Sequence, residues 1–264
     1  MRSRTASPKA SGNAVPRQRL DVALVRAGLA RSRSHAAELV GAGRVRVDGN
    51  PAAKSALPVA ETQRLDVVVG PDHVSRAGRK LAGALDALGP LGLEVAGRTA
   101  LDAGASTGGF TEELLRRGAA LVHAVDVGHG QLATPLREHP QVRPAEGVNV
   151  RYLAAGDLDP VPDLVVADLS FISLRLVLAP LAAVAVPGAD LLLLVKPQFE
   201  VGRERLGSGG VVRRERDRRA AVDAVLADAE ALGWTPRDVR ESVLPGPSGN
   251  VEYFAWWQAP GGTP

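Results

Sequence analysis

The chain has 264 residues, 45% of them hydrophobic and only 3% aromatic, which is enough for one domain of ordinary size and a small second one. It has no cysteine, so disulfides and thiolate metal sites are excluded and a reducing compartment, the cytoplasm, is expected. The net charge is +3, but residues 1–59 carry +8 (eleven Lys and Arg against three acidic residues), which predicts a basic module that binds a polyanion.

Residues 1–16 are basic and rich in Ser, Ala and Pro. They lack the apolar segment of a signal peptide, so we expect a disordered tail. The longest apolar stretch, residues 176–195, is interrupted by Pro180, Pro187, Gly188 and Asp190. No membrane-spanning segment, and therefore no integral membrane association, is predicted.

The basic module is predicted to fold as helix, helix and hairpin. Residues 20–28 have apolar side chains at helical spacing and end at a glycine, and a serine at 32 or 34 caps a second helix. Residues 44–48 alternate as in a strand and run into a turn. This order resembles the S4 RNA-binding domain, on the motifs Arg19-Leu20-Asp21, Ala30-Arg31-Ser32-Arg33 and Gly43-Arg44-Val45-Arg46-Val47-Asp48-Gly49.

The S4 resemblance implies that arginines of residues 17–62 bind the phosphates of structured RNA. The candidates are Arg19, Arg31, Arg33, Arg44 and Arg46. A solvated basic helical hairpin is the plain alternative. Residues 63–75, with one strand-like run at 65–69, are expected to connect this module to a second domain at 76–264.

Residues 99–118 predict a strand, a glycine-rich turn and a helix, the opening unit of a doubly wound sheet that binds a nucleotide-like ligand. The turn lacks the lysine of a P-loop, so binding of a nucleoside triphosphate is not expected. Asp126 ends the next strand, 24 residues after Asp102, where a carboxylate accepts the ribose hydroxyls of an adenosine. The cofactor-binding candidates are Asp102, Gly104, Ser106, Thr107, Gly108, Phe110, Asp126, Val127 and Asp168, with Glu146 and Asn149 placed on the adenine side by position alone.

The rest of the chain continues the sheet. Residues 163–167 predict a buried strand and residues 186–195 contain another, followed by a helix at 219–232 and strands at 238–244 and 251–257. Such a closing hairpin on a parallel sheet is typical of adenosylmethionine-dependent methyltransferases. Oxidoreductases with a dinucleotide-binding fold usually lack it.

Lysines are rare in this chain. Only four of the 32 basic residues are lysine, and two of these stand at structural positions: Lys80 in a helix that opens near residue 76, and Lys196 at the end of a strand. An ammonium can lose its proton on burial, whereas a guanidinium cannot. Asp168 and Glu252 also stand at strand ends or starts, so the four side chains are expected to converge on one crevice.

The order Lys80, Asp168, Lys196 and Glu252 is similar to the catalytic tetrad of FtsJ-like ribose 2′-O-methyltransferases. With an S4 module in front, the chain resembles the TlyA family of ribosomal RNA methyltransferases, whose members also carry the name hemolysin. The further motifs are Val74-Ser75-Arg76, Asp168-Leu169-Ser170-Phe171-Ile172-Ser173 and Lys196-Pro197-Gln198-Phe199-Glu200.

The resemblance implies a Rossmann-like α/β methyltransferase with a mostly parallel seven-stranded sheet, preceded by a small α+β S4 domain. It implies S-adenosyl-L-methionine as cofactor and ribose 2′-O-methylation of cytidine in ribosomal RNA or ribosomal subunits by a cytoplasmic monomer. Lys196 would be the base, with a pKa lowered by burial and by a neighbouring cation, Lys80. Asp168 and Glu252 would orient the two ammonium groups. No metal is expected, since the five histidines are scattered.

Three other functions are open. A pseudouridine synthase with an S4 module needs a different catalytic core. A membrane-active hemolysin would need a signal or a spanning segment. An RNA-binding ribosome factor without catalysis would have no use for the intact tetrad.

Overall fold

The computed structural model describes residues 17–30, 32–41, 43–67 and 74–261. The chain divides into two compact units, Met1–Asp72 and His73–Pro264. The expected tail of residues 1–16 and the RNA-binding candidate Arg31 lie outside the described residues.

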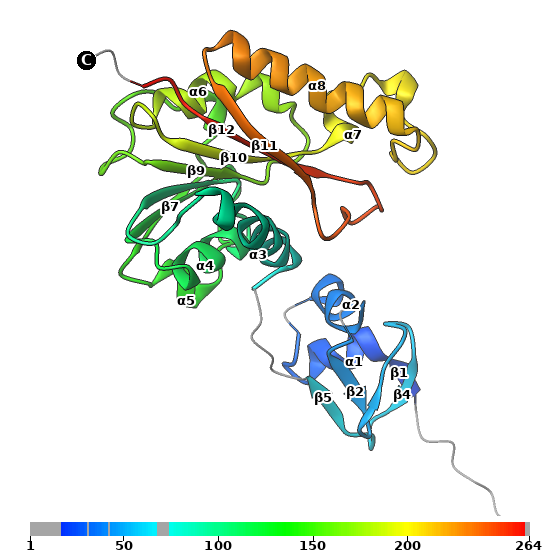
Figure 1. Ribbon diagram of the computed structural model, residues 1–264. Coiled ribbons are helices and arrows are strands. Elements are labelled where there is room, and N and C mark those ends of the chain that lie inside the picture. Colours follow the sequence, from blue (N-terminus) through cyan, green and yellow to red (C-terminus); the bar gives the residue numbers. More distant parts are fainter. Residues whose placement is uncertain (1–16, 31, 42, 68–73, 262–264) are drawn as a thin grey trace, which may run out of the picture. The chain divides into compact units, whose positions relative to one another are not determined.

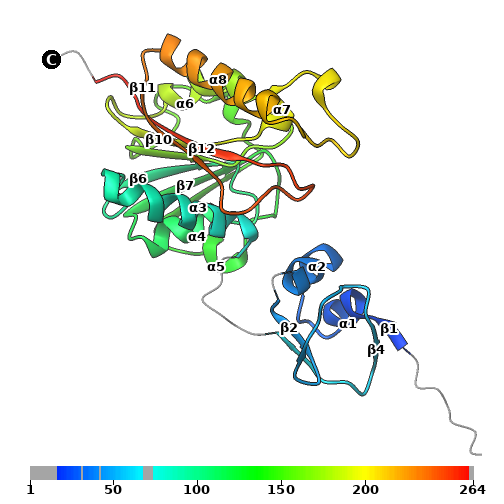
Figure 2. The ribbon, with the colours of Figure 1, turned by 45° about the vertical axis from the view of Figure 1, so that its right-hand side comes forward.

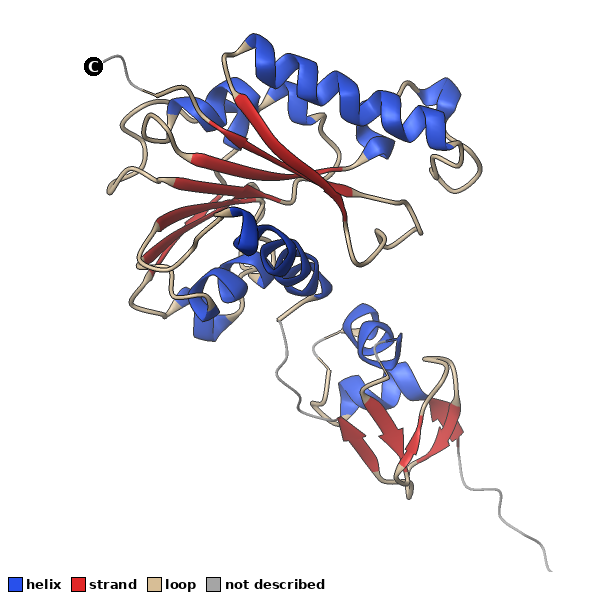
Figure 3. Ribbon diagram, in the orientation of Figure 1, coloured by secondary structure: helices blue, strands red, loops and turns tan. Residues whose placement is uncertain are grey.

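The first unit combines two helices with short antiparallel strands (Figure 3). Its elements are β1 (Arg17–Arg19), α1 (Leu20–Arg26), α2 (Arg33–Gly41), β2 (Val45–Val47), β3 (Asn50–Pro51), β4 (Pro58–Ala60) and β5 (Leu65–Val67). β1 pairs with β4, and β2 lies between β3 and β5. The apolar faces of both helices, with Leu20, Leu24 and Leu39, close a small core over Val45 and Val59.

One segment lies elsewhere than the sequence suggested. The strand-like run at 65–69 was expected in the connector, but β5 pairs with β2, and Leu65 and Val67 pack against the core of the first unit. Two alternating apolar side chains are too short a signal to reveal which sheet a strand joins, because that depends on pairing with a strand some 20 residues earlier.

The second unit contains a seven-stranded sheet in the order β11-β12-β10-β9-β6-β7-β8. Its strands are β6 (Thr99–Ala103), β7 (Leu121–Asp126), β8 (Val142–Glu146), β9 (Leu164–Ala167), β10 (Asp190–Val195), β11 (Thr235–Glu241) and β12 (Tyr253–Gln258). Strands β6 to β10 are mutually parallel, and only β12 runs antiparallel to its neighbours β10 and β11. The predicted mostly parallel sheet with a closing hairpin is confirmed.

Helices cover both faces of this sheet. They are α3 (Arg76–Leu88), α4 (Gly109–Arg116), α5 (Thr134–Arg137), α6 (Leu178–Ala183), α7 (Pro197–Glu200) and α8 (Glu215–Ala231), with 3₁₀ turns η1 (Gly89–Leu91), η2 (Val150–Tyr152), η3 (Leu174–Leu176) and η4 (Arg203–Arg205). Figures 1 and 2 both place α6 and α8 on one side of the sheet and α3, α4 and α5 on the other. Along β10, Leu191 and Leu193 join one core and Leu192 and Leu194 the other, as the period of a strand requires.

Several boundaries differ from the sequence prediction, and those of α8 and β11 are two clear cases. α8 begins at Glu215, four residues before the expected start, because its first turn is polar and is held by an Arg219–Glu215 ion pair at 2.8 Å. β11 runs over 235–241 instead of 238–244, since this charged edge strand has no alternating apolar pattern. Within the described ranges, no helix combines the length and apolar character needed to span a bilayer.

Candidate active site

The carboxyl ends of the five parallel strands meet at one edge of the sheet, the usual place for a ligand in this architecture. Asp126 and Glu146 are the last residues of β7 and β8, and Asp168 and Lys196 directly follow β9 and β10. The turn after β6 begins at Gly104. Topology therefore brings the charged strand-end residues to one edge, as the sequence predicted.

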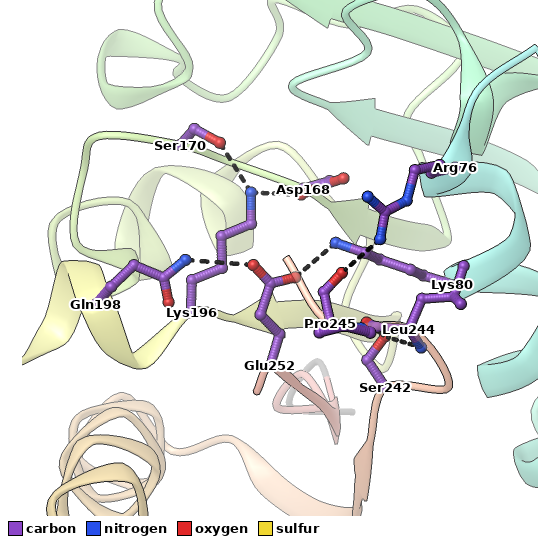
Figure 4. Close-up of polar contacts among 10 residues, drawn as sticks. All are labelled: Arg76, Lys80, Asp168, Ser170, Lys196, Gln198, Ser242, Leu244, Pro245 and Glu252. Atoms are coloured by element: carbon purple, nitrogen blue, oxygen red, sulfur yellow. Dashed lines mark hydrogen bonds and ion pairs between the residues drawn. The ribbon is translucent and has the colours of Figure 1, made fainter. Parts of the chain in front are cut away.

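Lys80 reaches this edge from α3 and pairs with Glu252. Its Nζ atom lies 2.5 Å from Glu252 Oε2, and both side chains are buried, with 7% and 1% exposure (Figure 4). The other carboxylate oxygen accepts a bond of 3.2 Å from Gln198 Nε2. A Cβ atom at Gly246 would stand 2.4 Å from Glu252 Oε1, so a glycine is needed there to admit the carboxylate.

Lys196 makes the second ion pair. Its Nζ atom lies 2.6 Å from Asp168 Oδ1 and donates to Ser170 Oγ at 2.8 Å (Figure 4). The lysine is buried and the aspartate is 16% exposed on its side chain, so this pair is desolvated but reachable. Two buried lysines thus have two carboxylates, which offsets the cost of removing charge from water.

A cavity of about 750 Å³ has Asp168 of the second pair in its wall, whereas Lys80, Lys196 and Glu252 do not line it. Six predicted cofactor-binding residues line it: Gly104, Ser106, Asp126, Val127, Asn149 and Asp168. Further lining comes from residues that the sequence did not single out as cofactor-binding, among them Gln131, Ser170, Phe171 and Ile172. Gln131 could not be found from the pattern, because it lies in a loop after β7 and reaches the turn only through a 3.2 Å bond with Ser106 Oγ.

The wall of the cavity is built on the glycine turn. Gly104 has a φ of +88°, and a Cβ atom there would stand 2.9 Å from the backbone oxygen of Asp168. Only glycine lets the two strand ends approach so closely. The Asp126 carboxylate holds the turn in place by accepting bonds from the backbone N–H groups of Ser106, at 2.8 Å, and Gly128, at 2.7 Å.

Asp102 lies behind the turn, fully buried. Its Oδ2 atom accepts a 2.6 Å bond from Thr111 Oγ1, while its Oδ1 atom is buried without a hydrogen-bond partner. Burial raises the pKa of this carboxyl to about 7, although the bond from Thr111 opposes the shift. Asp102 therefore supports the first turn of α4 from behind the glycine turn.

Comparison with known proteins identifies the second unit. The family model of FtsJ-like methyltransferases matches residues 73–259. The chain belongs to the FtsJ-like methyltransferase family. The model of the S4 domain matches residues 18–65, so the resemblance of both units is confirmed.

Relatives share both units. The 16S/23S rRNA (cytidine-2′-O)-methyltransferase TlyA of Mycobacterium tuberculosis is 55% identical over 91% of this chain and 89% of its own length. Hemolysin A of Brachyspira hyodysenteriae is 35% identical over 90% of this chain and 98% of its own. A solved structure described as a candidate hemolysin from Streptococcus thermophilus has a TM-score of 0.74 and 37% identity, over 94% of this chain and 90% of that one.

Within the FtsJ-like unit, five predicted cofactor residues do not line the cavity: Asp102, Thr107, Gly108, Phe110 and Glu146. Phe110 is only 2% exposed and stacks on Phe254 at 5.9 Å, because the first turn of α4 faces the sheet. Gly108, with a φ of +97°, is the N-cap of α4. Glu146 ends β8 with a buried Oε1 atom that has no hydrogen-bond partner.

In the S4 unit, two of the predicted RNA-binding arginines are held by one buried acid. Asp21 accepts bonds from Arg19 Nη2 at 2.8 Å and from Arg33 Nη2 at 3.2 Å, while these arginines stay 50% and 62% exposed. The bond from Arg19 holds the pKa of Asp21 far below its usual value. Arg46 points outward from β2 and Arg44 is half-buried before that strand.

Proposed function

We propose that this chain transfers a methyl group from S-adenosyl-L-methionine to the ribose 2′-hydroxyl of a cytidine in ribosomal RNA. The observation that carries the proposal is the two buried lysine–carboxylate pairs, one of which has Asp168 in the cavity wall, in a chain of the FtsJ-like family. The name of the 55% identical relative supports cytidine and ribosomal RNA as the substrate. Such a substrate implies action on ribosomal subunits in the cytoplasm, and we expect a monomer.

The residues around the cavity fit S-adenosylmethionine. The volume of the cavity, about 750 Å³, is in the range of pockets that enclose ligands of this size. Backbone groups of the turn from Gly104 to Ser106 would border the methionine part, and the Asp126 carboxylate would accept the ribose hydroxyls. Asn149 and Val127 would border the adenine. When bound, the cofactor supplies a methyl group activated by a sulfonium.

Lys196 is the proposed base. A ribose hydroxyl is a weak nucleophile, so its proton must leave as the oxygen–carbon bond forms. Lys196 must first give up the proton of its ion pair with Asp168. Its Nζ atom then accepts the proton of the hydroxyl, and the ammonium that forms again is stabilised by Asp168 Oδ1 at 2.6 Å and Ser170 Oγ at 2.8 Å. Lys80, held by Glu252, supplies a positive charge beside the attacking oxygen. Alignment of the two reactants provides much of the remaining rate.

The target base has a candidate platform in Phe171. This residue lines the cavity and is 92% exposed, which is unusual for a large apolar residue. Unpaired bases of RNA stack on such aromatic faces when they are turned out of their helix. The arginines of the S4 unit, led by Arg19 and Arg33, would bind phosphates elsewhere on the RNA and fix its position.

The test is direct. Ribosomal subunits from cells that lack this activity are incubated with the purified chain and S-adenosylmethionine, and 2′-O-methyl groups are mapped by mass spectrometry. We expect a methylated cytidine with the wild type and none with Lys196→Ala. Binding without methylation by folded wild type would favour a ribosome factor without catalysis, and methylation of a base atom would overturn the proposed chemistry.

A further inference from the structure

The loop after β9, residues 168–173, has an unusual conformation at its tip. Phe171 has a φ of +65°, in the left-handed region that residues with a bulky side chain rarely adopt, and the residue is 92% exposed. Such a conformation costs free energy and persists only where the surroundings impose it. We name residues 168–173 the platform loop.

Two sets of contacts hold the platform loop, and both come from residues 196–200. On one side, Lys196 Nζ donates to Ser170 Oγ at 2.8 Å. On the other side, Glu200 accepts a 2.6 Å bond from Ser173 Oγ and a 2.8 Å bond from the backbone N–H of Leu174.

Between these anchors, the ring of Phe199 contacts the ring of Phe171, with centroids 5.4 Å apart. The tip of the loop is therefore fixed on both sides and supported underneath by one short segment, the end of β10 and the helix α7. A strained residue held by three contacts is the arrangement expected of a preorganised binding surface.

Glu200 has no place in the proposed chemistry. It does not line the cavity, and its carboxylate contacts the platform loop, not the two lysines. The side chain is half-buried, and desolvation raises its pKa while the bonds from Ser173 and Leu174 oppose that shift. Because both carboxylate oxygens of Glu200 accept bonds from the end of the platform loop, Glu200 acts through that loop.

We propose that Glu200 is a positioning residue that fixes the platform loop, so that the Phe171 ring is held ready for a base of the RNA substrate. The inference rests on the proposed function and extends it to the recognition of RNA. Without Glu200, Ser173 and Leu174 lose their partner, and the backbone of Phe171 relaxes from its left-handed conformation. The ring then leaves its place at the cavity, and the RNA loses a preformed stacking surface.

The experiment compares Glu200→Ala, Glu200→Gln, Phe171→Ala and the double variant Glu200→Ala/Phe171→Ala. Glu204→Ala is the matched control, because that carboxylate is 74% exposed and its ion pair with Arg205 is 3.8 Å long. For each folded protein, KM and kcat for ribosomal subunits, the Kd for an RNA fragment and the Kd for S-adenosylmethionine are measured.

We expect Glu200→Ala to raise both KM and the Kd for RNA about tenfold, or about 1.4 kcal/mol, with the Kd for S-adenosylmethionine changed less than threefold. Glu200→Gln should recover most of the affinity, since the amide oxygen can accept from Leu174 and the amide N–H can donate to Ser173. Glu204→Ala should match wild type. In the double variant, loss of Glu200 should add less than twofold to the effect of Phe171→Ala.

Additive losses in the double variant would overturn the inference, because Glu200 would then act independently of Phe171. So would a Glu200→Ala variant with the RNA affinity of wild type, or one in which S-adenosylmethionine binding falls as much as RNA binding. If wild type bound RNA with this coupling but methylated nothing, the proposed function would fail while the role of Glu200 stood.

Discussion

Removal of the Glu252 carboxylate should destabilise the second unit strongly, whatever its effect on activity. Lys80 and Glu252 are 7% and 1% exposed and lie 2.5 Å apart, so Glu252→Ala leaves a buried ammonium without its counter-charge. Breaking a buried pair from one side costs about 3–5 kcal/mol. The paired replacement Lys80→Met/Glu252→Leu removes both charges and should recover most of that loss.

The assay is unfolding in guanidinium chloride followed by tryptophan fluorescence. All three tryptophans, Trp234, Trp256 and Trp257, belong to the second unit, so the signal reports on that unit alone. Arg219→Ala is the control, since it breaks an ion pair whose side chains are 75% and 63% exposed and should cost less than about 1 kcal/mol. If Glu252→Ala were as mild as this control, the Lys80 ammonium would not be desolvated, and the reasoning would be refuted.

Three further predictions concern Asp102, Asp126 and the two arginines Arg19 and Arg33. Asp102 has a pKa of about 7 in the folded protein against about 3.9 in an unfolded chain, so the unfolding free energy should fall by roughly 4 kcal/mol as pH rises from about 4 to about 7. Asp102→Asn should lose this dependence; unfolding free energies from urea that change equally with pH in the two proteins would refute the prediction. Asp126→Ala should weaken S-adenosylmethionine binding by about 1.5–3 kcal/mol in calorimetry, unless the carboxylate serves only the turn. Arg19→Ala/Arg33→Ala should lower the slope of log K against log salt for RNA binding by about 1.5–2 and leave cofactor affinity alone; an unchanged slope would remove these arginines from the RNA contact.

The strand-end residues were predictable because topology alone decides their place. A parallel sheet carries Asp126, Asp168 and Lys196 to one edge whatever the loops do. The same logic failed for Phe110, because a helix turns a large apolar residue towards the core when the sheet lies beneath it. Sequence position alone does not distinguish Phe110 from the strand-end residues, since all of them lie at the end of a strand or shortly after it.

The sequence could not predict which side chains of the site pair with each other. The pairing of Lys80 with Glu252 joins residues 172 positions apart, and only the packing of α3 against the hairpin brings them within 2.5 Å. Glu200 stood in a recognised motif, but its bonds to Ser173 and Leu174 depend on the path of the platform loop. Contacts between loops leave no periodic signal, which is why this part of the site required the structure.

The central claim is that Lys196 takes the proton of the ribose hydroxyl. The most direct test is single-turnover methylation of ribosomal subunits by Lys196→Arg and Lys196→Ala, with folding and S-adenosylmethionine binding measured first. Arginine keeps the charge but does not release its proton at any pH that a protein tolerates. The account predicts that Lys196→Arg is nearly as inactive as Lys196→Ala, at least about a hundredfold below wild type. Substantial methylation by a folded, cofactor-binding Lys196→Arg would contradict it and transfer the role of base to Lys80.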